Sequence, residues 1–129
     1  VLAVFPATRD GSAAGSSARE AALALQARLE ASVDRRLEWG QPLAAIDVAL
    51  HFGSVHYGNV GAPDRLDFTV IGQAVNTAAR IEGLCSMLGE PVLASEEFVR
   101  REGGAWDDRG AHDVKGVPQL RVFRPARFS

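Results

Sequence analysis

Apolar residues recur along the chain with two different periods, and these periods predict alternating helices and strands. Spacings of three and four predict a helix over residues 18–39, with a capping box of Ser17 and Glu20 at its start. The apolar stripe of this helix, expected to face a core, consists of Ala22, Leu25, Leu29, Val33 and Leu37. The same reasoning predicts a second helix over residues 75–88 and a short third one over residues 95–101.

Alternation of apolar and polar residues predicts strands between these helices. The predicted strands cover residues 1–6, 43–53, 65–71, 92–94, 107–114 and 120–123. Residues 8–17, rich in Gly, Ser and Ala, are typical of a connector, and glycines at 53, 58 and 61 predict a hairpin or arm. Helices and strands in this order predict an α+β fold with helices packed on a sheet.

Length and composition indicate one globular domain. The chain has 129 residues, of which 47% are hydrophobic and 23% are charged, as in ordinary folded proteins. Fourteen Lys and Arg against sixteen Asp and Glu give a net charge of −2, which offers no strong field for nucleic acid or an anionic membrane. We therefore expect neither as a partner. The arginines at 121, 124 and 127 are too sparse for nucleic acid and are expected to form a solvated strand edge.

The single cysteine, Cys85, excludes a disulfide within the chain and suits a reducing compartment, so we expect a cytoplasmic location. Cys85 falls on the apolar side of its predicted helix and is expected to be a small core residue. His51 is expected to be hydrogen-bonded within the fold. His51 and His56 are expected on opposite faces of a strand, which makes a zinc pair an unfavourable interpretation.

Two polar residues, Asn76 and Arg80, lie four positions apart and share one face of the helix predicted over residues 75–88. The opposite side carries Ala74, Ala78, Ile81, Cys85 and Leu88. Gly83 and Met87 continue the stripe of Asn76 and Arg80, and an outward methionine predicts that another subunit covers this face. From spacing alone, simple solvation of Asn76 and Arg80 remains an alternative to a binding site.

Three stretches of the sequence together resemble the catalytic domain of class III nucleotidyl cyclases, and in particular its bacterial adenylate cyclase branch. They are GNVG at residues 58–61, RLDFTVIG at residues 65–72 and VNTAAR at residues 75–80. The resemblance extends from Val1 to Val117. It implies that residues 1–129 are the C-terminal part of a cyclase catalytic domain, with a ferredoxin-like α+β fold and a mostly antiparallel sheet that lacks its N-terminal part.

The resemblance also implies roles for four residues. Asn76 would orient the ribose of ATP, and Arg80 would stabilise the charge that builds on the triphosphate. Lys115 matches the family lysine that holds the outer phosphates, although a solvated turn lysine is the alternative interpretation. Thr69 matches the position that reads the purine, where its hydroxyl favours adenine.

The implied reaction converts ATP to 3′,5′-cyclic AMP and pyrophosphate for intracellular signalling. Two other functions remain open: guanylate cyclisation, and a non-catalytic cyclase-like module that dimerises or binds nucleotide.

The resemblance implies two divalent metal ions, Mg or Mn, held by two aspartates that are expected before Val1. Asp10, Asp34 and Asp47 fall on unsuitable elements to replace them. We therefore expect no metal on this chain and no cyclase activity from the chain alone. Family sites form between two subunits, which implies a homodimer, and a sheet that lacks its first strand predicts self-association.

Overall fold

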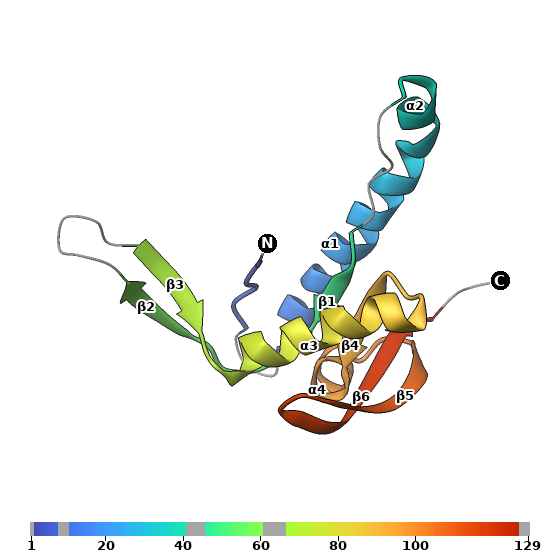
Figure 1. Cartoon of the computed structure of the whole chain (residues 1–129). Coiled ribbons are helices and arrows are strands. Elements are labelled where there is room, and N and C mark those ends of the chain that lie inside the picture. Colours follow the sequence, from blue (N-terminus) through green and yellow to red (C-terminus); the bar gives the residue numbers. More distant parts are fainter. Residues whose placement is uncertain (1, 8–10, 41–45, 61–66, 127–129) are drawn as a thin grey trace.

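The computed structural model describes residues 2–7, 11–40, 46–60 and 67–126, with the backbone alone for residues 34, 36, 57–60 and 67–70 (Figure 1). Its helices are α1 (Ser12–Ala31), α2 (Val33–Glu38), α3 (Gln73–Leu88) and α4 (Glu96–Glu102). Its strands are β1 (Val48–Leu50), β2 (His56–Val60), β3 (Asp67–Ile71), β4 (Val92–Ser95), β5 (Trp106–Val114) and β6 (Val117–Pro125). The predicted α+β class is confirmed. None of the helices in the described ranges is long and apolar enough to cross a membrane.

Four strands form one sheet in the order β1-β4-β6-β5. β1 pairs with β4 in parallel, whereas β4 with β6 and β5 with β6 are antiparallel, so most of the pairing is antiparallel as expected. β2 and β3 form a separate antiparallel ribbon that extends away from the sheet as an arm (Figure 1). The predicted hairpin is thus confirmed, and β3 leads directly into α3.

The core has two parts, one on each face of the sheet, because β4 is buried on both sides. Val92 and Ala94 of β4 point into one cluster and Leu93 points into the other, as the period of two in a strand requires. The first cluster also contains Ala18, Ala22, Leu50 and Phe98. The second also contains Ile81, Leu84, Cys85, Leu120 and Val122. Helices α1 and α4 therefore cover one face, and α3 covers the other.

The first helix differs from the prediction at both ends. α1 begins at Ser12, so the predicted capping box of Ser17 and Glu20 is wrong: both residues lie inside the helix, and the N-cap is Gly11. Residues 12–17 of the glycine-rich segment are helical, and Gly15 packs closely on α4. A Cβ added at Gly15 would lie 3.2 Å from the Cβ of Glu102, so a larger residue would push the two helices apart. The helix is interrupted at Ser32 and ends as α2.

The predicted apolar stripe of the first helix is also partly wrong. Ala22 is buried, but the side chains of Leu25 and Leu37 are 37% and 61% exposed. The buried stripe instead runs through Gly15, Ala18 and Ala22, because small residues face α4, while the C-terminal part of the helix extends past the sheet (Figure 1).

The strand predicted at residues 1–6 is not formed in the described part of that segment, residues 2–7. Leu2, Val4 and Phe5 are exposed, and none of the described strands pairs with them. Alternating apolar residues alone do not make a strand, because a strand also needs a neighbour for its backbone hydrogen bonds.

The second helix matches its prediction closely. α3 begins at Gln73 and ends at Leu88, the predicted last residue. Gly72, which joins β3 to α3, has a φ of 146°, and a Cβ there would lie 3.2 Å from the carbonyl oxygen of Ser54. A glycine is therefore required where the chain turns from the arm into the helix. At the other end, the backbone N–H of Gly89 donates to the carbonyl oxygen of Cys85 and closes the helix.

Candidate active site

One cavity, of about 330 Å³, contains three of the four site residues predicted from the sequence. It is lined by Gln73, Asn76, Arg80, Lys115, Gly116 and Val117. The first three come from the N-terminal half of α3, and the others come from the turn between β5 and β6. The fold thus brings Lys115 to the same cavity as Asn76 and Arg80, although it lies far from them in sequence.

The wall formed by α3 follows from the amphipathic pattern of that helix. Ile81, Leu84 and Cys85 are almost completely buried against the sheet, so the opposite face must point outward. Asn76 and Arg80 are exposed on that face, as the spacing predicted. Met87 continues the face beyond the cavity and is 73% exposed.

The wall that carries Lys115 is a tight turn held by side-chain hydrogen bonds. Gly116 has a φ of 83°, a conformation that favours glycine and lets β5 reverse into β6. Oδ1 of Asp113 accepts hydrogen bonds from the backbone N–H of Gln119 at 2.8 Å and from its side-chain Nε2 at 3.0 Å. Leu120, the next residue, is buried in the core. The turn is therefore tied to the sheet on the side where it meets the cavity.

The cavity has the electrostatic character of an anion site. Neither the Arg80 guanidinium nor the Lys115 ammonium has a hydrogen-bond or ion-pair partner among the described residues. Many other arginines are paired with carboxylates: Arg19, Arg100, Arg109, Arg121 and Arg124. A guanidinium and an ammonium left free on one cavity suit the oxygens of a phosphate group. Asn76 adds a carboxamide that can both donate and accept.

A charge network holds the far end of α3 against the strands that lead to Lys115. The buried carboxylate of Glu90 lies 3.0 Å from Nη1 of Arg124 and 3.5 Å from Nε of Arg109. Arg109 also donates from Nη2 to the carbonyl oxygen of Leu88 at 3.3 Å, which satisfies a C-terminal carbonyl of α3. The network joins α3 to β5 and β6, and so fixes the relative position of the two walls.

This network corrects one expectation. Arg124 is half-buried and bound to Glu90 and Asp107, so it is not a solvated edge residue. It is bound there because β6 is an interior strand of the sheet, beside the turn that carries Glu90. Arg121 is exposed and pairs with Asp108, whereas Arg127 lies outside the described residues.

Thr69, the fourth predicted site residue, lies in β3, where it pairs with Gly58 of β2. Its side chain is outside the described side chains, so its proposed contact with the purine stays a prediction. Its position is close in sequence to the cavity, because β3 passes through Gly72 straight into Gln73.

The expectations for His51 and Cys85 are confirmed. Nδ1 of His51 lies 2.7 Å from Oγ of Ser95, which also accepts the N–H of Phe98 at 3.2 Å. Burial lowers the pKa of His51, against an opposing effect of the Glu97 charge. Cys85 is 1% exposed, and its burial, aided by the charges of Asp47 and Glu82, raises the pKa of the thiol to about 12. His51 is thus a hydrogen-bonded part of the fold, and the buried thiol of Cys85, with its raised pKa, lacks the character of a nucleophile.

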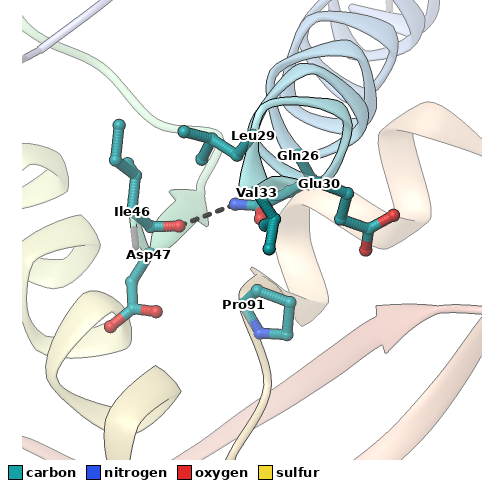
Figure 2. A pocket seen from close by; sticks show the side chains of 7 residues that line it. All are labelled: Gln26, Leu29, Glu30, Val33, Ile46, Asp47 and Pro91. Carbon is teal, nitrogen blue, oxygen red and sulfur yellow. Dashed lines mark hydrogen bonds between the residues drawn. The ribbon is translucent and has the colours of Figure 1, made fainter. Parts of the chain in front are cut away.

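A second, smaller cavity of about 170 Å³ lies between α1 and the segment that enters β1 (Figure 2). Its lining includes the apolar side chains of Leu29, Val33 and Pro91. Figure 2 shows the hydrogen bond that Nε2 of Gln26 donates to the carbonyl oxygen of Ile46, at 2.7 Å. None of the predicted site residues lines it.

The described residues do not fit a divalent metal centre. They contain no group of three or more His, Cys, Asp or Glu side chains placed to hold a metal ion. The cavity itself presents two cations and two carboxamides, whereas Mg²⁺ and Mn²⁺ prefer carboxylate oxygens. We therefore assign no metal ligand to this part of the chain.

Comparison with known proteins finds similarity to adenylate cyclases. The chain is 40% identical over 87 residues to an adenylate cyclase of Anabaena cylindrica, a match that covers 64% of this chain and 17% of the relative. It is 40% identical over 78 residues to adenylate cyclase 1 of Rhizobium meliloti, covering 60% and 12% of the two chains. The chain thus spans less than a fifth of the length of these relatives. No protein-family model matches it.

Among solved structures, the crystal structure of the adenylyl cyclase CyaB from P. aeruginosa is similar, with a TM-score of 0.51 and 29% identity. That match covers 61% of this chain and 41% of the other. The sequence and the fold are therefore similar to those of an adenylate cyclase catalytic domain, as the sequence predicted. More particularly, the chain is similar to a segment of the adenylate cyclases.

The sequence analysis missed three lining residues: Gln73, Gly116 and Val117. Gln73 precedes Asn76 by three positions and shares its helical stripe, but it lies before the helix predicted to begin at residue 75.

Proposed function

We propose that this chain forms the nucleotide-binding part of an adenylate cyclase active site, which converts ATP to 3′,5′-cyclic AMP and pyrophosphate. The observation that carries the proposal is the presence of Asn76, Arg80 and Lys115 on one cavity, with both cations free of partners among the described residues. The adenylate cyclase names of the relatives support ATP as the substrate.

In the proposed reaction the 3′ oxygen of the ribose attacks the α-phosphorus. A new bond forms between these two atoms while the 3′ hydroxyl releases its proton to solvent, the bond from the α-phosphorus to the bridging oxygen of the β-phosphate breaks, and pyrophosphate leaves. Arg80 opposes the negative charge that grows on the phosphate oxygens, and a fixed guanidinium does so with two parallel hydrogen bonds. Asn76 orients the ribose, Lys115 binds the outer phosphates, and Thr69 reads the purine.

The divalent ions that the family resemblance implies would neutralise the phosphates. Since the described residues do not fit a metal site, the chain's own contribution is binding, orientation and charge stabilisation. Residues 1–129 are thus proposed to be the C-terminal part of a catalytic domain. An ATP substrate and the free thiol of Cys85 both favour a cytoplasmic location for this part of the protein.

We also propose that the exposed face of α3 meets a second subunit. Met87 of α3, the helix that carries Asn76 and Arg80, is 73% exposed, and Ile71, the last residue of β3, is 54% exposed. Apolar side chains beside a binding site favour burial in an interface. Sedimentation at tens of micromolar would show self-association of the chain, and a clean monomer would contradict it.

The activity is tested on the longest gene product that contains this chain, with ATP and either Mg²⁺ or Mn²⁺, by separating cyclic AMP from ATP. Asn76→Ala and Arg80→Ala should each lower kcat strongly, for Arg80 by about 10²- to 10³-fold, with smaller changes in nucleotide affinity. Ser86→Ala, an exposed position of α3 outside the cavity, is the matched control and should leave kcat unchanged. Unchanged turnover in both cavity variants would refute the assigned roles.

The same assay applied to the 129-residue chain tests whether it acts alone. We expect no cyclic AMP from it, because we assign no metal carboxylates to its described residues. Production that depends on Mg²⁺ or Mn²⁺ would contradict this. Nucleotide binding by the gene product without any turnover would instead support the non-catalytic module, and turnover of GTP in place of ATP would support a guanylate cyclase.

A further inference from the structure

Gln73 is the one helical residue of the cavity to which the proposed function gives no task. It is the first residue of α3 and is exposed to the cavity. Its carboxamide has no hydrogen-bond partner among the described residues. A polar group that lines a cavity without a partner is available to a ligand, so its position relative to the other lining residues is informative.

Gln73, Asn76 and Arg80 form a ladder along one side of α3. Spacings of three and four keep them within one narrow sector of the helix surface. With a rise of about 1.5 Å per residue, the ladder extends for about 10 Å along the helix axis from Gln73 to Arg80. Its order is carboxamide, carboxamide, guanidinium.

The chemistry of a nucleotide has a matching order of base, sugar and phosphates. If Asn76 binds the ribose and Arg80 binds the phosphates, the nucleotide runs from the N-terminus of α3 towards its C-terminus. Gln73 then lies beyond the sugar, on the side of the base. This is also the end of α3 that connects to β3, the strand of Thr69.

We propose that Gln73 contacts the nucleobase and contributes to the selection of adenine over guanine; the inference rests on the proposed function. Its Oε1 accepts from the adenine N6 amino group while its Nε2 donates to N7. Guanine has the acceptor O6 in place of the N6 amino group, beside the acceptor N7. The carbonyl oxygen of Gln73 would therefore face another acceptor, O6, and form no hydrogen bond with it. The carboxamide therefore fits adenine with two hydrogen bonds and guanine with fewer.

The test compares ATP with GTP on the longest gene product that contains the chain. Gln73→Leu, which keeps the size and removes both polar groups, should lower the ratio of kcat/KM for ATP to that for GTP by about 5- to 140-fold. The loss should fall mainly on the KM for ATP, because the base contact is the same before and during reaction. Gln73→Lys supplies donors alone, as guanine requires, and should shift the ratio further towards GTP.

Two controls separate a base contact from a structural effect. Ser86→Ala, on the same helix but outside the cavity, should leave the ratio unchanged. A merely structural role for Gln73 would lower turnover of both nucleotides together and would not move the ratio, which would overturn the inference. Circular dichroism of each variant verifies that α3 is retained.

The outcomes also distinguish this inference from the proposed function. A wild-type protein that cyclises ATP, combined with an unchanged nucleotide ratio in Gln73→Leu and Gln73→Lys, overturns the assignment of Gln73 and leaves the cyclase activity standing. A wild-type protein that neither binds nor cyclises either nucleotide rejects the proposed function, and the role of Gln73 falls with it.

Discussion

Gly53 follows β1 and approaches the first turn of α3 so closely that alanine at this position tests how the start of the helix is held. A Cβ at Gly53 would lie 2.7 Å from the Cβ of Ala74 and 3.5 Å from Nε2 of His51. The first distance is far below ordinary van der Waals contact, and the methyl group of Ala74 has no rotamer that would avoid it, so the backbone of α3 must move. Gly53→Ala should therefore push the first turn of α3 outward.

The sign of the change in the free energy of unfolding distinguishes this contact from the general effect of replacing a glycine. The φ of Gly53 lies outside the left-handed region, so alanine is allowed there, and stiffening the unfolded chain would by itself stabilise the protein by about 0.4–1 kcal/mol. Overpacking at a contact costs about 1–3 kcal/mol. The clash exceeds the gain, and Gly53→Ala should lower the free energy of unfolding by about 1–2 kcal/mol.

Urea unfolding followed by circular dichroism measures this change, and two further variants make it specific. Gly83→Ala is the matched control: it lies in α3 with no atom within 4 Å of the added Cβ, and it should stabilise by about 0.5–1 kcal/mol. Ala74→Gly removes the clashing methyl, so the double variant Gly53→Ala/Ala74→Gly should be more stable than the sum of the single changes predicts. Gly53→Ala as stable as wild type would refute the contact.

Three other predictions concern His51, Ser95 and Cys85. Because the pKa of His51 is lowered in the folded state, the unfolded chain binds the proton more tightly, so stability should fall as pH drops below about 6.5, and His51→Asn should flatten that slope in urea titrations at pH 5–8. Ser95→Ala removes the N-cap of α4 and the hydroxyl beside His51, and should cost about 1–2 kcal/mol in the same assay. The Cys85 thiol, with its pKa of about 12, should not react with a disulfide reagent at neutral pH until urea unfolds the chain, and rapid reaction of the native protein would contradict its burial.

The helix that carries Asn76 and Arg80 could be predicted from the sequence because its two faces differ sharply. Ile81 and Cys85 repeat on one side, the polar residues repeat on the other, and Gly89 ends the helix. Local pattern and tertiary packing agree here, so the predicted end and the predicted exposed face are both confirmed.

The first helix could not be predicted in the same way, because its burial depends on size rather than on hydrophobicity. Gly15, Ala18 and Ala22 face α4 since small residues allow the helices to approach closely. A search for large apolar residues selects Leu25 and Leu37 instead, which are exposed. The contact between α1 and α4 joins residues that are distant in sequence, and the periodicity of one helix contains no information about its partner.

The composition of the cavity depends both on a local helical pattern and on contacts between residues that are distant in sequence. The position of Asn76 and Arg80 on one stripe is a local property, whereas the presence of Lys115 opposite them depends on the pairing of β5 with β6 and on the burial of Leu120 and Val122. The family resemblance anticipated Lys115 through its motif, but spacing gave no reason to choose it over a solvated turn lysine.

The two ends of α3 are held in different ways, and this difference bears on how the site works. Its C-terminal half is buried in the core, and its last carbonyls are tied by Arg109 to the β5–β6 strands. Its first turn follows Gly72 from the β2–β3 arm, and the Cβ of Ala74 in that turn faces Gly53. Arg80 directly precedes Ile81, the first core residue of the C-terminal half, which suits the charge stabilisation proposed for it. Gln73 and Asn76 stand on the part next to the arm and Gly53, so a displacement of the arm would act first on the base and sugar contacts proposed for these two residues.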